Sequence, residues 1–121
     1  MTSWQTWIDL LQRFESDLGN PADPAQTINW QQSLIDDEAE SIPWPQIQFL
    51  QQWGFVEYSI PKTLGGKLDS LLELYLLGQL LARRDITLAV AIGITFFAAI
   101  PIWLAGNETL QKKLIEHMRK G

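Results

Sequence analysis

Apolar residues recur every three or four positions near the start of the chain, which is the spacing of one face of an α-helix. The apolar positions of this segment are Trp4, Trp7, Ile8, Leu11, Phe14 and Leu18. Ser3 stands where an N-terminal cap is needed, and Gly19 stands where a helix commonly ends. The pattern therefore predicts a helix over residues 4–18.

Two shorter helices are expected before residue 55. Asp23-Pro24 places a capping residue ahead of a proline, so it is expected to start the second helix. The buried face of this helix should consist of Trp30, Leu34 and Ile35. Pro45 is expected to start the third helix, which should end at Gly54. Its inward side chains should be Phe49, Leu50 and Trp53.

The middle of the chain combines a short apolar piece, a glycine turn and a leucine-rich helix. Residues 55–60 are expected to be extended, and Leu64-Gly65-Gly66 is expected to form a tight turn in which glycine takes a positive φ. Asp69 is expected to cap a helix that continues to about Arg84. Leucines surround most of this helix, so we expect it to be buried on several sides.

Residues 86–105 contain no charged side chain. Twenty such residues are long enough to cross a bilayer, so a membrane span is one interpretation. The favoured one is the central buried helix of a globular bundle, because Gly93 and Pro101 weaken a helix and a charged segment follows directly. In that last segment Asn107 is expected to cap a helix, with basic residues near its C-terminal end.

These elements predict an all-α protein, a small bundle of about five or six helices. Residues 1–121 are expected to form a single helical domain, because this length favours one domain. The apolar content of 46% and the charged content of 19% are those of a folded chain. The N-terminal segment carries charges and is not a signal peptide, so a cytoplasmic location is expected.

Composition excludes several classes of function. The chain has no cysteine and one histidine, His117, which leaves little material for a metal site or a cysteine nucleophile. The net charge is −5, with −8 in residues 1–60 and +3 in residues 61–121, and this argues against a nucleic-acid binder. His117 is expected on the surface, and the Gly65-Gly66 turn lacks the combined lysine and hydroxyl pattern of a phosphate-binding loop. An acidic run is expected to be a solvated loop: Asp36, Asp37, Glu38 and Glu40. No catalytic, cofactor-binding or metal residue is assigned.

Six short motifs follow one another along the last two thirds of the chain. They are Ile42-Pro43, Gly54-Phe55, Ile60-Pro61 with Gly65-Gly66, Leu81-Ala82-Arg83-Arg84-Asp85, Pro101-Ile102 with Gly106-Asn107-Glu108, and a final Gly121. In this order and spacing, residues 42–121 resemble the N-terminal helical domain of acyl-CoA dehydrogenases. Residues 1–41 match that family only as a helical lead-in.

The resemblance implies part of an FAD-dependent oxidoreductase of fatty acid metabolism. In the family, a β-barrel domain and a C-terminal helical domain supply most of the flavin contacts and the catalytic glutamate. Both are expected to be absent here, so the chain alone should neither bind FAD tightly nor act as an enzyme. Expected partners are an acyl-CoA or acyl-carrier thioester, the remaining domains or a partner flavoprotein subunit, and further copies in a homo-oligomer. Neither nucleic acid nor a membrane is expected as a partner.

The resemblance also assigns the domain a place in the enzyme, as a wall of the acyl-chain pocket. Residues four apart share a helix face, so Ala89, Gly93 and Phe97 line up and Val90 lies beside them. These four are the expected substrate residues, with Phe97 closing a groove left by the small ones. The alternative is a non-catalytic helical binding or scaffold module that pairs with another flavoprotein subunit.

Overall fold

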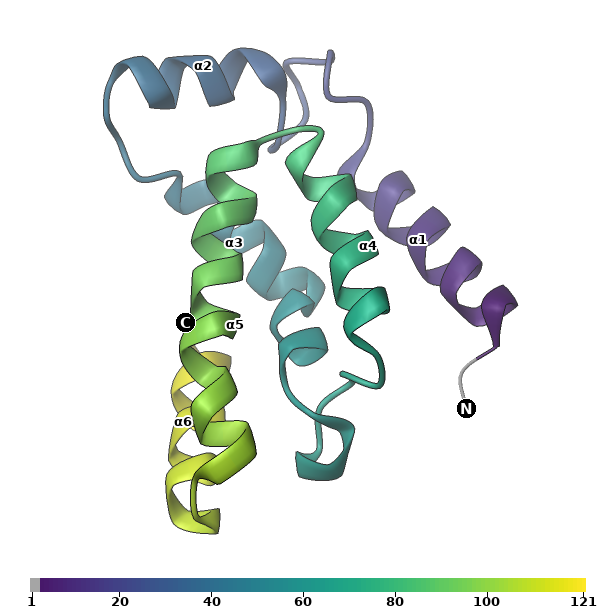
Figure 1. Cartoon of the computed structure of the whole chain (residues 1–121). Helices are drawn as coiled ribbons and strands as arrows, with labels where there is room; N and C mark the ends of the chain where they lie inside the picture. The colour runs from purple at the N-terminus through teal and green to yellow at the C-terminus, as the bar shows by residue number, and fades with distance from the viewer. Residues whose placement is uncertain (1–2) are drawn as a thin grey trace.

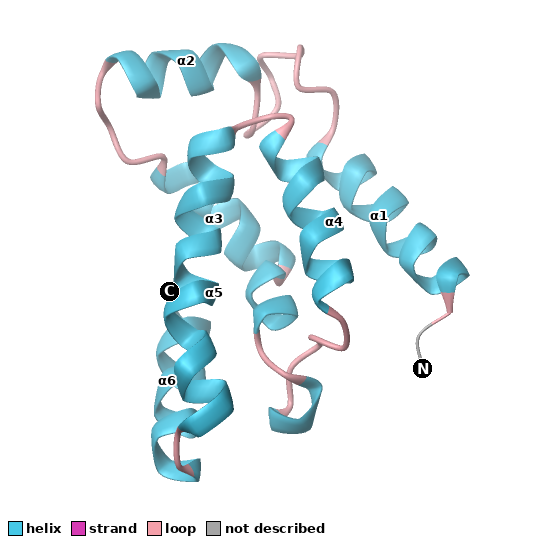
Figure 2. Cartoon of the chain, viewed as in Figure 1, coloured by secondary structure: helices cyan, strands magenta, loops and turns pink. Residues whose placement is uncertain are grey.

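The computed structural model describes residues 3–121 (Figure 1). Within that part of the chain there are six α-helices, two short 3-10 helices and no β-strand (Figure 2). The α-helices are α1 (Trp4–Leu18), α2 (Trp30–Glu38), α3 (Trp44–Trp53), α4 (Leu71–Ala82), α5 (Ile86–Ala105) and α6 (Glu108–Lys120). The 3-10 helices are η1 (Phe55–Ser59) and η2 (Lys62–Leu64). The expected all-α class is confirmed.

Local side-chain chemistry sets several helix ends where the sequence predicted them. The Ser3 hydroxyl accepts a hydrogen bond from the Thr6 amide at the start of α1, at 3.3 Å. The Asn107 side chain accepts one from the Leu110 amide at the start of α6, at 2.8 Å. Gly54 ends α3 with φ of 90°, a conformation that favours glycine. These caps act over three or four residues, so sequence alone could identify them.

Differences from the prediction include two helix starts and one element type. Helix α2 starts after Asn29, which accepts from the Gln32 amide at 2.8 Å, while Asp23 instead stabilises a turn by accepting from the Ala25 amide. Helix α4 starts after Ser70, one residue later than Asp69 was expected to place it. Residues 55–59 form a 3-10 turn rather than an extended piece, because the left-handed Gly54 leads directly into it.

The main core lies where α1, α3, α4 and η1 meet. The buried residues are Leu10, Phe14, Leu18, Ile28, Leu50, Phe55, Tyr58, Leu77, Leu81 and Leu88. Phe14 is fully buried, and its ring centre lies 4.5 Å from that of Trp53 and 5.7 Å from that of Phe55. A second, smaller core joins η1, α5 and α6 through Ile60, Ala99, Ile115 and Met118.

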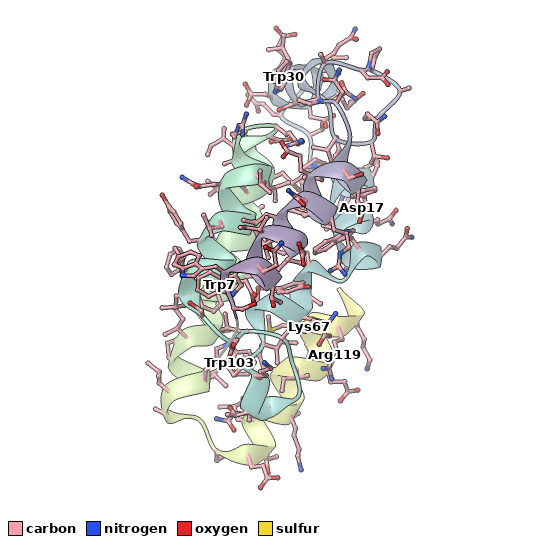
Figure 3. All side chains as sticks on the ribbon, turned by 90° about the vertical axis from the view of Figure 1, so that its right-hand side faces the viewer. Trp7, Asp17, Trp30, Lys67, Trp103 and Arg119 are labelled. Carbon is pink, nitrogen blue, oxygen red and sulfur yellow. The ribbon has the colours of Figure 1, made fainter. Side chains whose placement is uncertain are left out.

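The ion pair of Arg119 and Glu57 ties α6 to η1. Arg119 Nε donates to Glu57 Oε1 at 2.7 Å, and Arg119 Nη2 donates both to Glu57 Oε2 at 3.0 Å and to the Gly65 carbonyl at 3.2 Å. Figure 3 shows Arg119 reaching toward the segment that carries Lys67. The hydrogen bonds from Arg119 lower the pKa of Glu57 below its ordinary value. The C-terminal end of α6 is therefore held by this ion pair as well as by apolar packing.

The expectation that α2 buries its tryptophan face was wrong. Helix α2 lies across one end of the molecule (Figure 1), and Trp30, Leu34 and Ile35 are all about half exposed. Trp30 Nε1 donates to the Arg83 carbonyl at 3.0 Å, which fixes the helix by one polar contact at its start. The helical spacing identified an apolar face, but no other helix of the described chain packs over it.

The expectation that α4 and α5 are buried on several sides was also wrong. Helix α5 packs on α4 and on α6, and its remaining face is open, with Phe97 70% and Leu104 82% exposed. Helix α4 likewise exposes Leu71 and Tyr75. Helix α5 continues through Pro101 to Ala105, so proline does not break it. It is long and apolar enough to cross a membrane, and only 17% of its most apolar stretch is buried.

Candidate functional site

An apolar groove of about 570 Å³ runs along the seam between α4 and α5. Its lining residues are Phe55, Ser59, Leu71, Leu74, Tyr75, Gly78, Gln79, Leu81, Ala82, Ala89, Val90, Ile92, Gly93, Ile94, Phe96, Phe97 and Ile100. The two helices form an antiparallel hairpin whose corner is residues 83–85. The groove therefore has one end at the corner, near Ala82 and Ala89, and the other near Leu71 and Ile100.

All four residues expected from the sequence lie in this groove. Ala89, Val90, Gly93 and Phe97 share one wall, as their spacing on a helix requires. Phe97 is largely exposed, so it stands at the mouth of the groove and does not plug its interior. The structure thus brings these four side chains together, and their role toward a substrate stays a prediction.

Sequence reasoning missed the opposite wall. Helix α4 contributes residues three or four apart: Leu71, Leu74, Tyr75, Gly78 and Ala82. The leucine pattern of this helix predicts burial on several sides, and it does not indicate a groove. The signal was present, because Gly78 and Ala82 are small residues one turn apart on a helix that consists mostly of leucine.

The groove offers an apolar surface with few polar groups. Tyr75 Oη accepts a hydrogen bond from Gln79 Nε2 at 3.0 Å, and Ser59 is the other polar residue of the lining. The lining contains no carboxylate, lysine, arginine or histidine. Among residues 3–121, no three His, Cys, Asp or Glu side chains are grouped to hold a metal ion. The walls can bind an apolar chain, but they supply no group for proton transfer at neutral pH.

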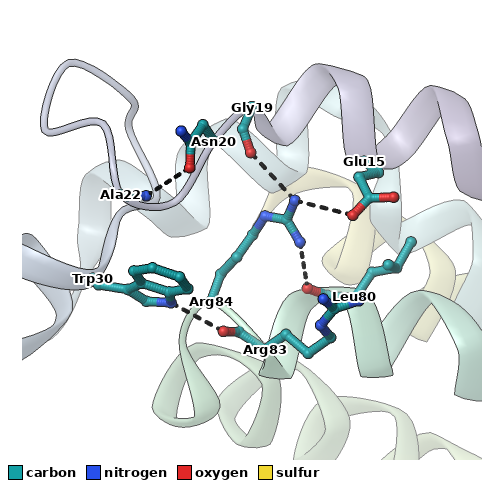
Figure 4. A network of polar contacts seen from close by, with 8 residues as sticks. All are labelled: Glu15, Gly19, Asn20, Ala22, Trp30, Leu80, Arg83 and Arg84. Atoms are coloured by element: carbon teal, nitrogen blue, oxygen red, sulfur yellow. Dashed lines mark hydrogen bonds and ion pairs between the residues drawn. The ribbon is translucent and has the colours of Figure 1, made fainter.

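The corner of the hairpin is fixed by a buried arginine (Figure 4). Arg84 donates to the Leu80 carbonyl at 2.9 Å and to the Gly19 carbonyl at 3.2 Å, and its Nη2 lies 3.7 Å from Glu15 Oε1. Next to it, buried Asp85 accepts from the Leu88 amide at 2.9 Å and so caps α5. These contacts tie the end of α1 to the corner and hold the two groove walls at that end.

A polar cleft on the other side of α4 contains a buried carboxyl group. Glu73 is only 6% exposed, and its Oε1 atom has no hydrogen-bond partner. It lies with Arg13, Lys62 and Lys67 in a cleft between α1 and the glycine turn. Burial, and secondarily the charge of Asp69, raise the pKa of Glu73, while Lys62 acts in the opposite direction.

Replacing Glu73 with glutamine is expected to stabilise the protein at neutral pH. A raised pKa in the folded state means that Glu73 contributes its full stability below about pH 4.5, its ordinary value, and loses it as the pH rises through the folded pKa. The gain of Glu73→Gln should therefore grow from pH 4 to pH 7, measured as the difference in Tm by circular dichroism. Glu38→Gln, an exposed site on α2, is the control. A difference between Glu73→Gln and wild type that stays constant with pH would contradict this assignment.

The remaining candidates from the sequence lie outside the groove. Asp36 is within α2 and accepts hydrogen bonds from Gln32 and Gln46. The acidic run therefore forms the C-terminal end of α2 and is not the solvated loop that was expected. His117 is exposed on α6, as expected. The glycine turn is confirmed as a tight turn, with φ of 91° at Gly65.

Comparison with known families gives a match over most of the chain. The family model described as acyl-CoA dehydrogenase, N-terminal domain, matches residues 27–121. The matched region begins at residue 27. It therefore includes part of residues 1–41, which the motifs matched to the family only as a helical lead-in. Comparisons with curated proteins and with solved structures give no match.

Proposed function

Because this chain belongs to the acyl-CoA dehydrogenase family, through its N-terminal domain, we propose that the α4–α5 groove forms one wall of an acyl-chain pocket. The enzyme would be an acyl-CoA dehydrogenase-like oxidoreductase. The observation that carries the proposal is the groove itself, which is long, apolar and built partly from the four residues expected to meet a substrate.

The chemistry of the groove suits an acyl chain. A saturated chain has no hydrogen-bonding groups, so it is bound by apolar contact, and each buried methylene contributes about 0.8 kcal/mol. The few polar atoms of the lining include Tyr75 Oη, which already has Gln79 as a partner. An apolar occupant would therefore leave that hydrogen bond intact.

The reactive groups would come from outside the described residues of this chain. The family is FAD-dependent in general. A flavin dinucleotide needs donors for its diphosphate, and the groove has no cationic side chain, so these residues do not fit the cofactor. The proposal therefore assigns to this domain substrate binding and the exclusion of water, and assigns the flavin and the base to other domains or to a partner flavoprotein subunit.

The proposal includes partners and a location. The substrate would be an acyl-CoA or acyl-carrier thioester, the assembly would be a homo-oligomer, and the compartment would be the cytoplasm.

A second candidate function, a non-catalytic binding module, is supported by the open apolar faces of α4 and α5. A third, a membrane span by α5, is supported by its length and lack of charge. Recovery of the chain only in a carbonate-resistant membrane fraction would favour the third.

Phe97→Ala is expected to shift the acyl preference toward longer or bulkier chains. The ring stands at the mouth of the groove, and its removal widens the groove there. The measurement joins this domain to the β-barrel and C-terminal domains of a family relative and follows bleaching of the flavin absorbance across a chain-length series. Leu104→Ala, outside the groove on the same helix, is the control. The pocket assignment fails if Phe97→Ala leaves the profile unchanged, and the division of roles fails if the 121-residue chain oxidises acyl-CoA by itself.

A further inference from the structure

Two glycines face the groove from opposite walls. Gly78 lies in the interior of α4 and Gly93 in the interior of α5, and both line the groove. A Cβ atom built on either one would meet no heavy atom within 4 Å. Neither has a positive φ. Nothing in the packing or the backbone therefore requires glycine at these two positions.

The other six glycines all have a structural reason. Positive φ angles or close contacts account for Gly19, Gly54, Gly65, Gly66, Gly106 and Gly121. Gly66, for example, would place a Cβ 2.1 Å from the Ile60 carbonyl oxygen. The two unexplained glycines are thus the two that line the groove.

Glycine is also unfavourable where these two residues lie. It ranks just above proline as a helix former, because it loses the most backbone freedom on folding. Alanine at either position would stabilise the helix and would fit the folded chain. One use of glycine that remains is to let another molecule approach the backbone closely.

We propose that Gly78 is a specificity-determining residue, at which the acyl chain lies against the bare backbone of α4 while it crosses Gly93 on α5. This inference rests on the proposed function and extends it to the wall that the sequence did not identify. Gly78 lies four residues before the end of α4 and Gly93 seven residues after the start of α5. Both are therefore in the half of the hairpin nearer its corner.

A chain that enters from the end opposite the corner, near Leu71 and Ile100, must pass the two glycines to reach Ala82 and Ala89. The residue at position 78 thus sets how many methylenes the groove accepts. A large side chain at position 78 should act on long chains and leave short ones unaffected.

The test uses the full chain labelled with ¹⁵N and acyl-CoA of increasing length, from butyryl to dodecanoyl. In the wild type, dodecanoyl-CoA should shift the amide signals of Gly78 and Gly93 and leave those of Gly54 and Gly65 unmoved. Gly78→Leu should weaken dodecanoyl-CoA binding about tenfold or more, as expected when two or more methylenes lose their contacts. Butyryl-CoA binding should change less than about twofold, since its chain ends before position 78.

Two further variants control for effects on folding. Ala91→Leu adds three carbons, one fewer than Gly78→Leu, at an exposed position of α5 outside the groove, and it should bind every chain length as the wild type does. Gly78→Ala should raise Tm, because its Cβ meets open space.

The outcomes separate this inference from the proposed function. If no acyl-CoA shifts any groove residue of the wild type, this inference is overturned, whereas the proposed function is overturned by an unchanged chain-length profile of Phe97→Ala in the fused enzyme. If the wild type binds dodecanoyl-CoA and Gly78→Leu binds it equally well, only the role of Gly78 is overturned. If Gly78→Leu weakens acyl-CoA binding equally at every chain length, this role is also overturned, because the effect would then not depend on the length of the acyl chain.

Discussion

Replacing Leu77 with alanine is expected to lower the free energy of unfolding by about 2–5 kcal/mol. Leu77 is fully buried on α4 and packs in the main core, which includes Leu81 and Phe14. The substitution removes buried methyl groups and leaves a cavity, since the surrounding helices relax only in part. Urea unfolding followed by circular dichroism gives this free energy directly.

The same substitution at an exposed leucine provides the matched control. Leu104 on α5 is 82% exposed, and Leu104→Ala should change the free energy of unfolding by less than about 0.5 kcal/mol. A loss at Leu104 as large as that at Leu77 would mean that α5 is covered in solution, by a second copy or by another surface. In that case the open face described above would not exist in the free protein.

Replacing Gly66 with alanine is expected to lower the free energy of unfolding by about 1–3 kcal/mol. The added Cβ would lie 2.1 Å from the Ile60 carbonyl oxygen and 2.5 Å from Ile60 Cβ. The backbone cannot easily move away, because Gly66 donates to the Pro61 carbonyl at 3.1 Å and Leu68 donates to the Ile60 carbonyl at 3.0 Å. Thermal unfolding of the variant, at matched protein concentration, measures the loss.

Gly93→Ala is the control for this second substitution. The new methyl group meets no atom and lies in a helix interior, so stability should rise by up to about 1 kcal/mol. Opposite signs at Gly66 and Gly93 would show that the glycine turn is held by close contact. A neutral Gly66→Ala would show that the turn can open to admit a side chain, contrary to the packing described here.

The helix ends could be predicted because they depend on neighbours in sequence. Ser3, Gly54 and Asn107 act on amides or carbonyls within a few residues, and the structure confirms all three. The start of α2 was missed because Asp23 and Asn29 are both good caps. Sequence alone does not say which of them meets free amides, and in the folded chain Asp23 is used in a turn instead.

Burial was harder to predict than secondary structure. Helical spacing shows that Trp30 and Phe97 belong to apolar faces, but it does not show which surface covers those faces. Trp30 was expected to be buried and Phe97 to close a groove, and both are exposed. The same limit explains why only one wall of the groove was predicted. The α5 wall follows from spacing along one helix, whereas the α4 wall depends on how two helices meet.

The unequal size of the two cores has a consequence for how the protein opens. The main core contains ten buried residues and the core under α6 contains four. Less apolar area holds α6 in place, so a partial unfolding that releases this helix requires less free energy than unfolding of the whole chain. No residue of α6 lines the α4–α5 groove. Such an open state would therefore keep the lining residues of both groove walls, while it exposes the part of α5 around Ala99 that α6 covers.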